Sequence, residues 1–262
     1  MDADALSAAG LSHDVAGPIA TITLRRPEVR NAQTPAMWRA LADIGGALGD
    51  DVRVVVVRGQ GQSFSAGLDR AMLDPTNTSG EESVAGLLAL SDEEVSATID
   101  AYQRGFTFLR DPRFVSIAAV QGYAIGAGLQ LALSCDLRVL ADDAQLCMKE
   151  SALGLVPDLT GTKPLVECVG YARALEICAT ARMVGADEAV QIGLALTAVP
   201  AAELDATVAD LAGALTAPMA GAVRETKALL QGAADRSLDD QRRLEREAQT
   251  RRFRELAALM AG

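Results

Sequence analysis

Two stretches of small residues stand where a strand is expected to give way to a helix. The first, SAGLD, spans residues 65–69, and the second, GAG, spans residues 126–128. The first N–H groups of a helix lack partners within the helix, and small residues let a ligand approach them closely. Two such turns side by side would direct two N–H groups at one oxygen atom, which suits an oxyanion that develops during a reaction. Close backbone packing would explain either turn alone equally well.

Two carboxylates and one amide are the candidates for proton chemistry. Glu150 follows an expected strand and precedes an apolar loop, and Asp158 lies later in that loop. A carboxylate in an apolar pocket has its pKa raised toward working pH, which makes it an effective proton shuttle. Gln130, on the helix after the second turn, can hold water but cannot exchange a proton at neutral pH. From position alone, an isolated glutamate such as Glu150 is more often a surface charge.

Other common chemistries lack their motifs. A dinucleotide fingerprint needs a third glycine where this chain has Leu131, and no phosphate-binding P-loop or GxSxG elbow occurs. The single histidine, His13, argues against a Ser-His-Asp triad. The four cysteines show no metal-ligand spacing, so we expect no metal site and expect them to act as small core residues in a reducing compartment.

The composition excludes several classes of partner. The chain has 262 residues, a net charge of −11 and only 3% aromatic residues. This acidity argues against nucleic acids and anionic membrane surfaces, and any anionic ligand must be held by local arginines or backbone N–H groups. The acidic N-terminus is not a signal peptide, and no apolar run reaches membrane-spanning length, so we expect a cytoplasmic protein.

Strand and helix patterns alternate in the elements that must position these residues. Residues 19–26 and 52–59 are predicted strands around a helix over 34–50, and this order is typical of a parallel sheet. Further strands are predicted at 115–120 and 136–141, with a helix over 91–111 and a polar, exposed stretch at 74–83. The later chain is mostly helical by spacing, with helices at 163–182, 185–193, 201–215, 217–233 and 238–260 and one strand at 195–200.

Four motifs occur in order along the chain: RRPEVRNA (25–32), FSAGLD (64–69), QGYAIGAGLQLALSCDLRV (121–139) and ESALGLVPDLTGT (150–162). Together they resemble the enoyl-CoA hydratase/isomerase family, the crotonase superfamily, over about residues 19–260. The resemblance implies an α/β fold with a crotonase-like spiral of ββα turns and a helical C-terminal trimerisation region. Residues 1–200 would form the core with the active site, and residues 201–262 would form the oligomerisation region of the same single domain, in a homotrimer or a dimer of trimers.

The resemblance also implies a site. The substrate would be an acyl-CoA thioester, with CoA as part of the substrate and no separate cofactor or metal. The oxyanion-hole N–H groups would belong to Leu68 and Ala127, in agreement with the argument from the two turns. Residues 74–91 and the helix from Glu93 are expected to shape the acyl pocket. The substrate- and CoA-binding positions implied are Glu28, Val29, Arg30, Ala66, Gly67, Asp69, Arg70, Tyr123 and Gly126.

The catalytic positions depart from the family pattern. Hydratases of the family carry two glutamates, of which the first falls on Gln130 and the second on Glu150. Asp158 occupies a position that is glycine in typical hydratases and an acid in dienoyl-CoA isomerases, which also keep a carboxylate at the position of Gln130. We therefore predict a double-bond isomerase with Glu150 as its proton shuttle. A hydratase in which Asp158 replaces the missing glutamate and an acyl-CoA binding protein with little turnover are the alternatives.

Overall fold

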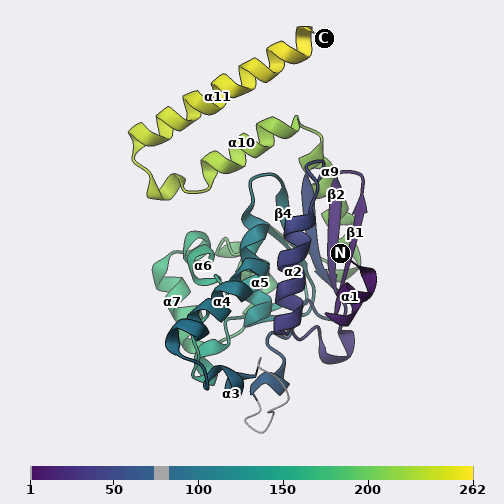
Figure 1. Ribbon diagram of the computed structural model, residues 1–262, viewed down its shortest axis with the longest axis vertical. Coiled ribbons are helices and arrows are strands. Elements are labelled where there is room, and N and C mark those ends of the chain that lie inside the picture. The colour runs from purple at the N-terminus through teal and green to yellow at the C-terminus, as the bar shows by residue number, and fades with distance from the viewer. Residues whose placement is uncertain (1, 74–82, 262) are drawn as a thin grey trace.

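The computed structural model describes residues 2–73 and 83–261, and a six-stranded sheet forms its centre (Figure 1). The strand order is β1-β2-β3-β4-β6-β9; β1 is antiparallel to β2, and the later neighbours are parallel. The strands are Leu11–Ala16 (β1), Ile19–Leu24 (β2), Val54–Gly59 (β3), Val115–Val120 (β4), Leu137–Ala141 (β6) and Thr197–Val199 (β9). The parallel sheet predicted from the alternating pattern is confirmed.

A second sheet has three strands in the order β5-β7-β8, which are Tyr123–Ile125, Gln145–Cys147 and Val184–Gly185. β5 follows β4 through a turn at Gly122, and β7 follows β6, so the chain passes twice from the large sheet to the small one. Ser65 extends the small sheet through a parallel bridge to Ala124. Paired strands followed by a helix thus repeat along the chain, as the predicted spiral of ββα turns requires.

Several helices begin directly after a residue whose side chain caps them. The Thr34 side chain accepts from the N–H of Met37, with Pro35 in the first helical position, and Ser91 and Glu94 form a capping box. The α-helices are Ala3–Ala8 (α1), Pro35–Ala47 (α2), Val84–Leu87 (α3), Asp92–Thr107 (α4), Ala127–Ser134 (α5), Thr162–Val169 (α6), Tyr171–Thr180 (α7), Ala186–Gln191 (α8), Leu204–Thr216 (α9), Ala220–Leu230 (α10) and Leu238–Ala261 (α11).

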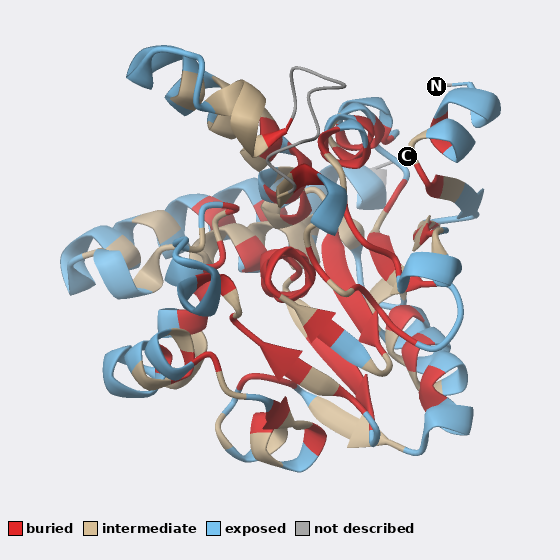
Figure 2. Ribbon diagram, turned by 90° about the horizontal axis from the view of Figure 1, so that it is seen from below, coloured by how far each residue is buried: buried red, intermediate tan, exposed pale blue. Residues whose placement is uncertain are grey.

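Both faces of the large sheet are covered, and Figure 2 shows buried residues along its strands. On β3, Val55 and Val57 join the larger apolar cluster with residues of α2, α4 and α5. Val54 and Val56 join a smaller cluster with residues of α9. The continuous β-branched run is therefore buried on both faces, because successive side chains of a strand point to opposite sides.

Several elements differ from the sequence predictions. Helices α1 and α3 and strands β1, β5 and β8 were not predicted. The single helix predicted over 163–182 is wrong, because Gly170, with φ of 75°, ends α6 and precedes α7. The SAGLD turn leads into a short 3-10 helix, Arg70–Leu73, and Leu68 itself lies in an extended segment instead of at a helix start. Of the predicted polar stretch 74–83, residues 74–82 lie outside the described residues.

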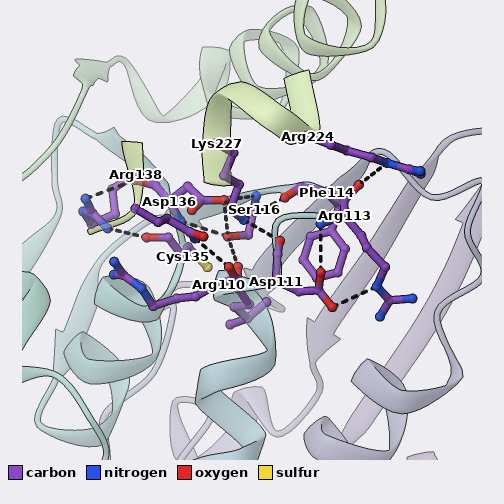
Figure 3. A network of polar contacts seen from close by, with 12 residues as sticks. Arg110, Asp111, Arg113, Phe114, Ser116, Cys135, Asp136, Arg138, Arg224 and Lys227 are labelled. Atoms are coloured by element: carbon purple, nitrogen blue, oxygen red, sulfur yellow. Dashed lines mark hydrogen bonds and ion pairs between the residues drawn. The ribbon is translucent and has the colours of Figure 1, made fainter. Parts of the chain in front are cut away.

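Helices α10 and α11 extend away from the sheets (Figure 1), and a buried ion pair anchors α10 (Figure 3). Lys227 Nζ donates to the carbonyls of Asp111 and Phe114 and to Oδ2 of Asp136, each over 2.7 Å. Oδ2 of Asp136 also accepts from the N–H and hydroxyl of Ser116 on β4.

In the described part of the chain, no single helix is long and apolar enough to span a membrane; segments 201–216 and 220–235 meet that test only together, across a 102° bend.

Candidate active site

Two hydrogen bonds to Gln33 hold the backbone around Leu68. Gln33 donates its N–H to the carbonyl of Gly67 over 2.7 Å, and its carbonyl accepts from the N–H of Asp69 over 2.8 Å. In this parallel pairing the N–H of Leu68 points away from Gln33, and it has no acceptor among the residues that the structure describes. The turn predicted to present this N–H therefore leaves it available.

The second turn lies against the first. Gly67 has φ of 89°, and a Cβ added to it would lie 2.4 Å from the carbonyl oxygen of Ile125 and 3.5 Å from the backbone nitrogen of Ala127. Ala127 is the first residue of α5, so its N–H has no partner within the helix. The structure thus brings together the turns of Leu68 and Ala127, and glycine is needed where they touch.

Glu150 lies beside the second turn. It opens a 3-10 helix, Glu150–Leu153, and is only 8% exposed. A Cβ added to Gly126, the residue before α5, would lie 3.3 Å from Oε1 of Glu150. Burial raises the pKa of the Glu150 carboxyl, and the negative charge of Asp158 raises it further. Oε2 of Glu150 is buried and has no hydrogen-bond partner among the described residues.

Gln130 uses its amide to hold Glu150 and a loop. Its Nε2 donates to Oε1 of Glu150 over 2.7 Å. Its Oε1 accepts the N–H groups of Leu159 and Gly161 over 2.9 Å and 3.2 Å. Because two backbone donors need an acceptor, the amide oxygen must face the loop and the nitrogen must face Glu150. Gln130 is 1% exposed, and only one of its N–H bonds is left for water.

The loop that Gln130 holds carries Asp158. Thr160 has φ of 67°, a left-handed conformation that is uncommon for a β-branched residue, and the N–H groups on either side of it converge on Gln130. The Asp158 carbonyl accepts from Nε2 of Gln103 on α4 over 2.7 Å. Although Asp158 as a residue is exposed, the surrounding protein desolvates its carboxyl group and raises its pKa.

Several of the predicted CoA-binding residues contact one another or residues of the two turns. The guanidinium of Arg30 lies over the ring of Tyr123, 5.4 Å from its centroid, and the carbonyl of Arg30 accepts from the N–H of Ala66. Asp69 forms an ion pair with Arg26 over 2.8 Å. The other exposed members of this predicted set are Glu28, Val29 and Arg70.

Among residues 2–73 and 83–261, no group of three or more His, Cys, Asp or Glu side chains is arranged to hold a metal ion.

Sequence reasoning missed three buried polar residues that support the first turn, namely Asn31, Gln33 and Ser65, each 0% exposed. The sequence offers no distinct signal for them, because Asn31 and Gln33 stand in a mostly polar stretch before α2 and Ser65 stands among small and polar residues before Gly67.

Comparisons with known proteins identify the family. A family model described as enoyl-CoA hydratase/isomerase matches residues 14–259. The short-chain-enoyl-CoA hydratase of Clostridium acetobutylicum is 30% identical over 235 residues, covering 88% of this chain and 85% of the relative. The peroxisomal Delta(3,5)-Delta(2,4)-dienoyl-CoA isomerase of Arabidopsis thaliana is 34% identical over 181 residues, covering 69% of this chain and 64% of the relative.

A solved structure extends the agreement to the whole fold. A protein from Thermobifida fusca YX, in complex with acetoacetyl-CoA, is 52% identical and has a TM-score of 0.93, over 97% of this chain and 98% of that chain. Hydratases and isomerases thus both stand among the relatives, and the names alone do not choose between the two reactions.

Proposed function

The chain belongs to the enoyl-CoA hydratase/isomerase family, and we propose that it moves the double bond of an enoyl-CoA thioester, with Glu150 as the proton shuttle. The observation that carries the proposal is the pairing of Glu150 with an amide, Gln130, in place of a second carboxylate. The acetoacetyl-CoA bound to the Thermobifida fusca structure supports an acyl-CoA substrate.

The N–H groups of Leu68 and Ala127 supply the electrostatic part of the reaction. The thioester oxygen would accept from the N–H groups of Leu68 and Ala127, whose turns are in contact. Negative charge grows on this oxygen when a proton leaves the α-carbon. Donors already fixed at that place stabilise the charge without reorganising, and one such donor is typically worth about 3 kcal/mol.

Glu150 supplies the proton transfer. Its carboxylate removes a proton from C2 of a 3-enoyl thioester, and the electron pair of that C–H bond is delocalised into a dienolate. The same carboxyl group then returns the proton to C4, so the double bond moves from C3–C4 to C2–C3 and Glu150 is again ionised. Burial strengthens Glu150 as a base, because it raises the pKa of the carboxyl group.

Gln130 disfavours hydration. Adding water to a conjugated thioester needs a base for the water proton and a proton for the α-carbon, which two carboxylates provide. The amide oxygen and one N–H of Gln130 are already hydrogen-bonded to the protein, and an amide has no proton to exchange at neutral pH. Loss of general acid–base help typically slows a reaction by about 100- to 10,000-fold.

Hydration with Asp158 as the second carboxylate is the second candidate. The favouring observation is that Gln130 is hydrogen-bonded both to Glu150 and to the loop that carries Asp158. The charge of Asp158 also raises the pKa of Glu150, and desolvation raises the pKa of Asp158 itself. The isomerase remains our first choice, because it needs only one carboxylate, Glu150, and no second group that exchanges a proton.

Separate assays with a 3-enoyl-CoA and a 2-enoyl-CoA test the proposal. We expect isomerisation of the former, and Glu150→Gln is expected to slow it by about 100- to 10,000-fold. Glu203→Gln, on an exposed 3-10 helix, is the matched control and should retain full activity. Fast hydration that survives Glu150→Gln would contradict the mechanism. Tight binding of acyl-CoA without turnover of either substrate would identify a binding protein.

The assembly and the location are proposals as well. We propose a homotrimer or a dimer of trimers in the cytoplasm, with no separate cofactor. Helix α11 exposes apolar side chains that a partner subunit could cover, including Phe253 at 62% and Leu259 at 63% exposed. Light scattering coupled to size-exclusion chromatography would measure the mass, and a monomer at micromolar concentration would contradict this proposal.

A further inference from the structure

A series of buried hydrogen bonds connects helix α2 to the turn that carries Leu68. Nε1 of Trp38 on α2 donates to Oε1 of Gln33 over 2.8 Å. Nε2 of Gln33 donates in turn to the hydroxyl oxygen of Ser65 over 3.1 Å. Gln33 and Ser65 are both 0% exposed, and Trp38 is 4% exposed. A buried polar series of this kind fixes one arrangement of its members, because each unpaired group would be costly.

The Ser65 hydroxyl is fully used. It donates to the carbonyl of Asn31 over 2.8 Å and accepts from Nε2 of Gln33 and from the N–H of Gly67 over 3.2 Å. One donor and two acceptor sites are the whole capacity of a hydroxyl group. The peptide group before Gly67 is therefore oriented by Ser65, and this peptide directly precedes the one that carries the Leu68 N–H.

Ser65 also contacts the second turn. Its N–H donates to the carbonyl of Tyr123 over 2.8 Å, and its carbonyl accepts from the N–H of Ile125 over 3.0 Å. A Cβ added to Gly128, in the first turn of α5, would lie 2.6 Å from the carbonyl oxygen of Ser65. Ser65 is thus bonded to one turn through its side chain and packed against the other through its backbone.

We infer that Ser65 and Gln33 are positioning residues that hold the N–H groups of Leu68 and Ala127 in register for one thioester oxygen. Gln33 contributes in two ways. Its backbone is hydrogen-bonded to the residues on either side of Leu68, and its side chain donates to the Ser65 hydroxyl. Both side chains are completely buried, so they act through the backbone and do not contact substrate. This inference rests on the proposed oxyanion hole and adds to it the side chains that set its geometry.

Two variants remove the side-chain part of this arrangement. Ser65→Ala deletes the acceptor of the Gly67 N–H, and Gln33→Met deletes the donor to Ser65 while keeping a side chain of similar length. Removing an oxyanion-hole donor outright costs about 100- to 1,000-fold in kcat, so misaligning one should cost about 10- to 100-fold. We expect KM to change less than about threefold, because these groups act mainly on the transition state.

The carbonyl stretching frequency of a bound thioester reports the positioning directly. The probe is butyryl-CoA labelled with ¹³C at the thioester carbon, observed by isotope-edited infrared spectroscopy. In the unmodified protein, two aligned donors should lower the frequency relative to the free thioester in water. In Ser65→Ala and Gln33→Met, the lowering should be smaller and should accompany the loss in kcat.

Ser116→Ala is the matched control. Ser116 is also 0% exposed and its hydroxyl is also hydrogen-bonded, but to Leu109 and Asp136. It should leave the frequency and kcat unchanged. If the unmodified protein shows no lowering, the proposed oxyanion hole fails and this inference with it. If the lowering is present and both variants retain it with full kcat, the inference alone is overturned. Should Ser65→Ala not fold, Gln33→Met decides between these results.

Discussion

Nε2 of Gln130 donates a hydrogen bond to Oε1 of Glu150 over 2.7 Å. This bond leaves Oε2 of Glu150 as the oxygen without a partner among the described residues. The same amide accepts two backbone N–H groups from the loop of Asp158. Gln130 therefore determines which oxygen of Glu150 can act as a base and where the second carboxylate of the site is held.

Gln130→Glu should convert the site toward hydration. The N–H groups of Leu159 and Gly161 would donate readily to a carboxylate at this position, since they already converge on one oxygen. A second carboxylate beside Glu150 would raise the apparent pKa of the pair, so that one proton is shared and the site holds an acid and a base together. We expect hydration of a 2-enoyl-CoA to become about 100-fold faster, measured as loss of the conjugated-thioester absorbance.

The control for this change is Gln191→Glu, which adds the same charge at the exposed end of α8. It should leave hydration at the level of the unmodified protein. An unchanged hydration rate in a folded Gln130→Glu protein would show that the missing carboxylate does not limit hydration.

The pH dependence of isomerisation should follow Glu150. The base is the carboxylate form, and burial raises its pKa above the ordinary value of 4.5. The kcat should therefore fall as pH decreases through a midpoint above 4.5 and should be constant at higher pH. A mechanism that also needs protonated Asp158 would add a second fall at high pH and give a bell-shaped profile. A pH series of kcat with a 3-enoyl-CoA distinguishes the two.

The raised pKa also predicts the effect of Glu150 on stability. The folded protein binds this proton more tightly than the unfolded chain, so the contribution of the group is most favourable below the ordinary pKa and is lost as pH rises through the folded value. Glu150→Gln removes the cost of the buried charge and keeps an acceptor for Gln130. Its thermal midpoint should exceed that of the unmodified protein at pH 8, and the difference should shrink toward pH 4. Equal gains at both pH values would contradict this assignment.

The buried ion pair of α10 gives a stability prediction away from the site. Lys227→Met would leave the Asp136 carboxylate without its cation, and breaking such a pair typically costs about 3 to 5 kcal/mol in the free energy of unfolding. Lys163→Met is the matched control, because Lys163 pairs with Asp235 on the surface, where solvent screens the two charges and the pair adds little stability. Urea denaturation of both variants measures the difference, and similar losses would contradict the role of the buried pair.

Much of the fold could be predicted from local patterns. The β-branched run of β3 and the capping residues of α2 and α4 mark elements whose boundaries the structure moves by only a few residues. The break at Gly170 was missed because apolar residues keep a helical spacing on both sides of it, and a glycine inside a helix is only mildly unfavourable. Strand β1 was missed because half of its residues are exposed and its pattern is weak.

The residues of the site could be predicted from the motifs, but the contacts between them could not. The motifs placed Leu68 and Ala127 on two turns, and the structure brings those turns together. That Leu68 lies in an extended segment depends on its pairing with Gln33, a contact between distant residues that spacing cannot reveal. Likewise, the type of residue 130 predicted a lost proton donor, whereas its bonds to the loop of Asp158 depend on the left-handed conformation of Thr160.

Gly67→Ala tests whether the contact between the two turns matters. Alanine at a φ of 89° is strained, and its Cβ would lie 2.4 Å from the carbonyl oxygen of Ile125, so the turn must shift. The free energy of unfolding should fall by more than about 1 kcal/mol. The kcat should fall by about 100-fold or more, because the Leu68 N–H moves with the turn.

Gly46→Ala, on α2 with no atom within 4 Å of the added Cβ, is the control. It should instead raise stability by about 0.5 to 1 kcal/mol and leave kcat unchanged. Urea denaturation and the isomerisation assay measure both variants, and a Gly67→Ala protein as stable and active as the original would show that Leu68 and Ala127 do not need this close approach.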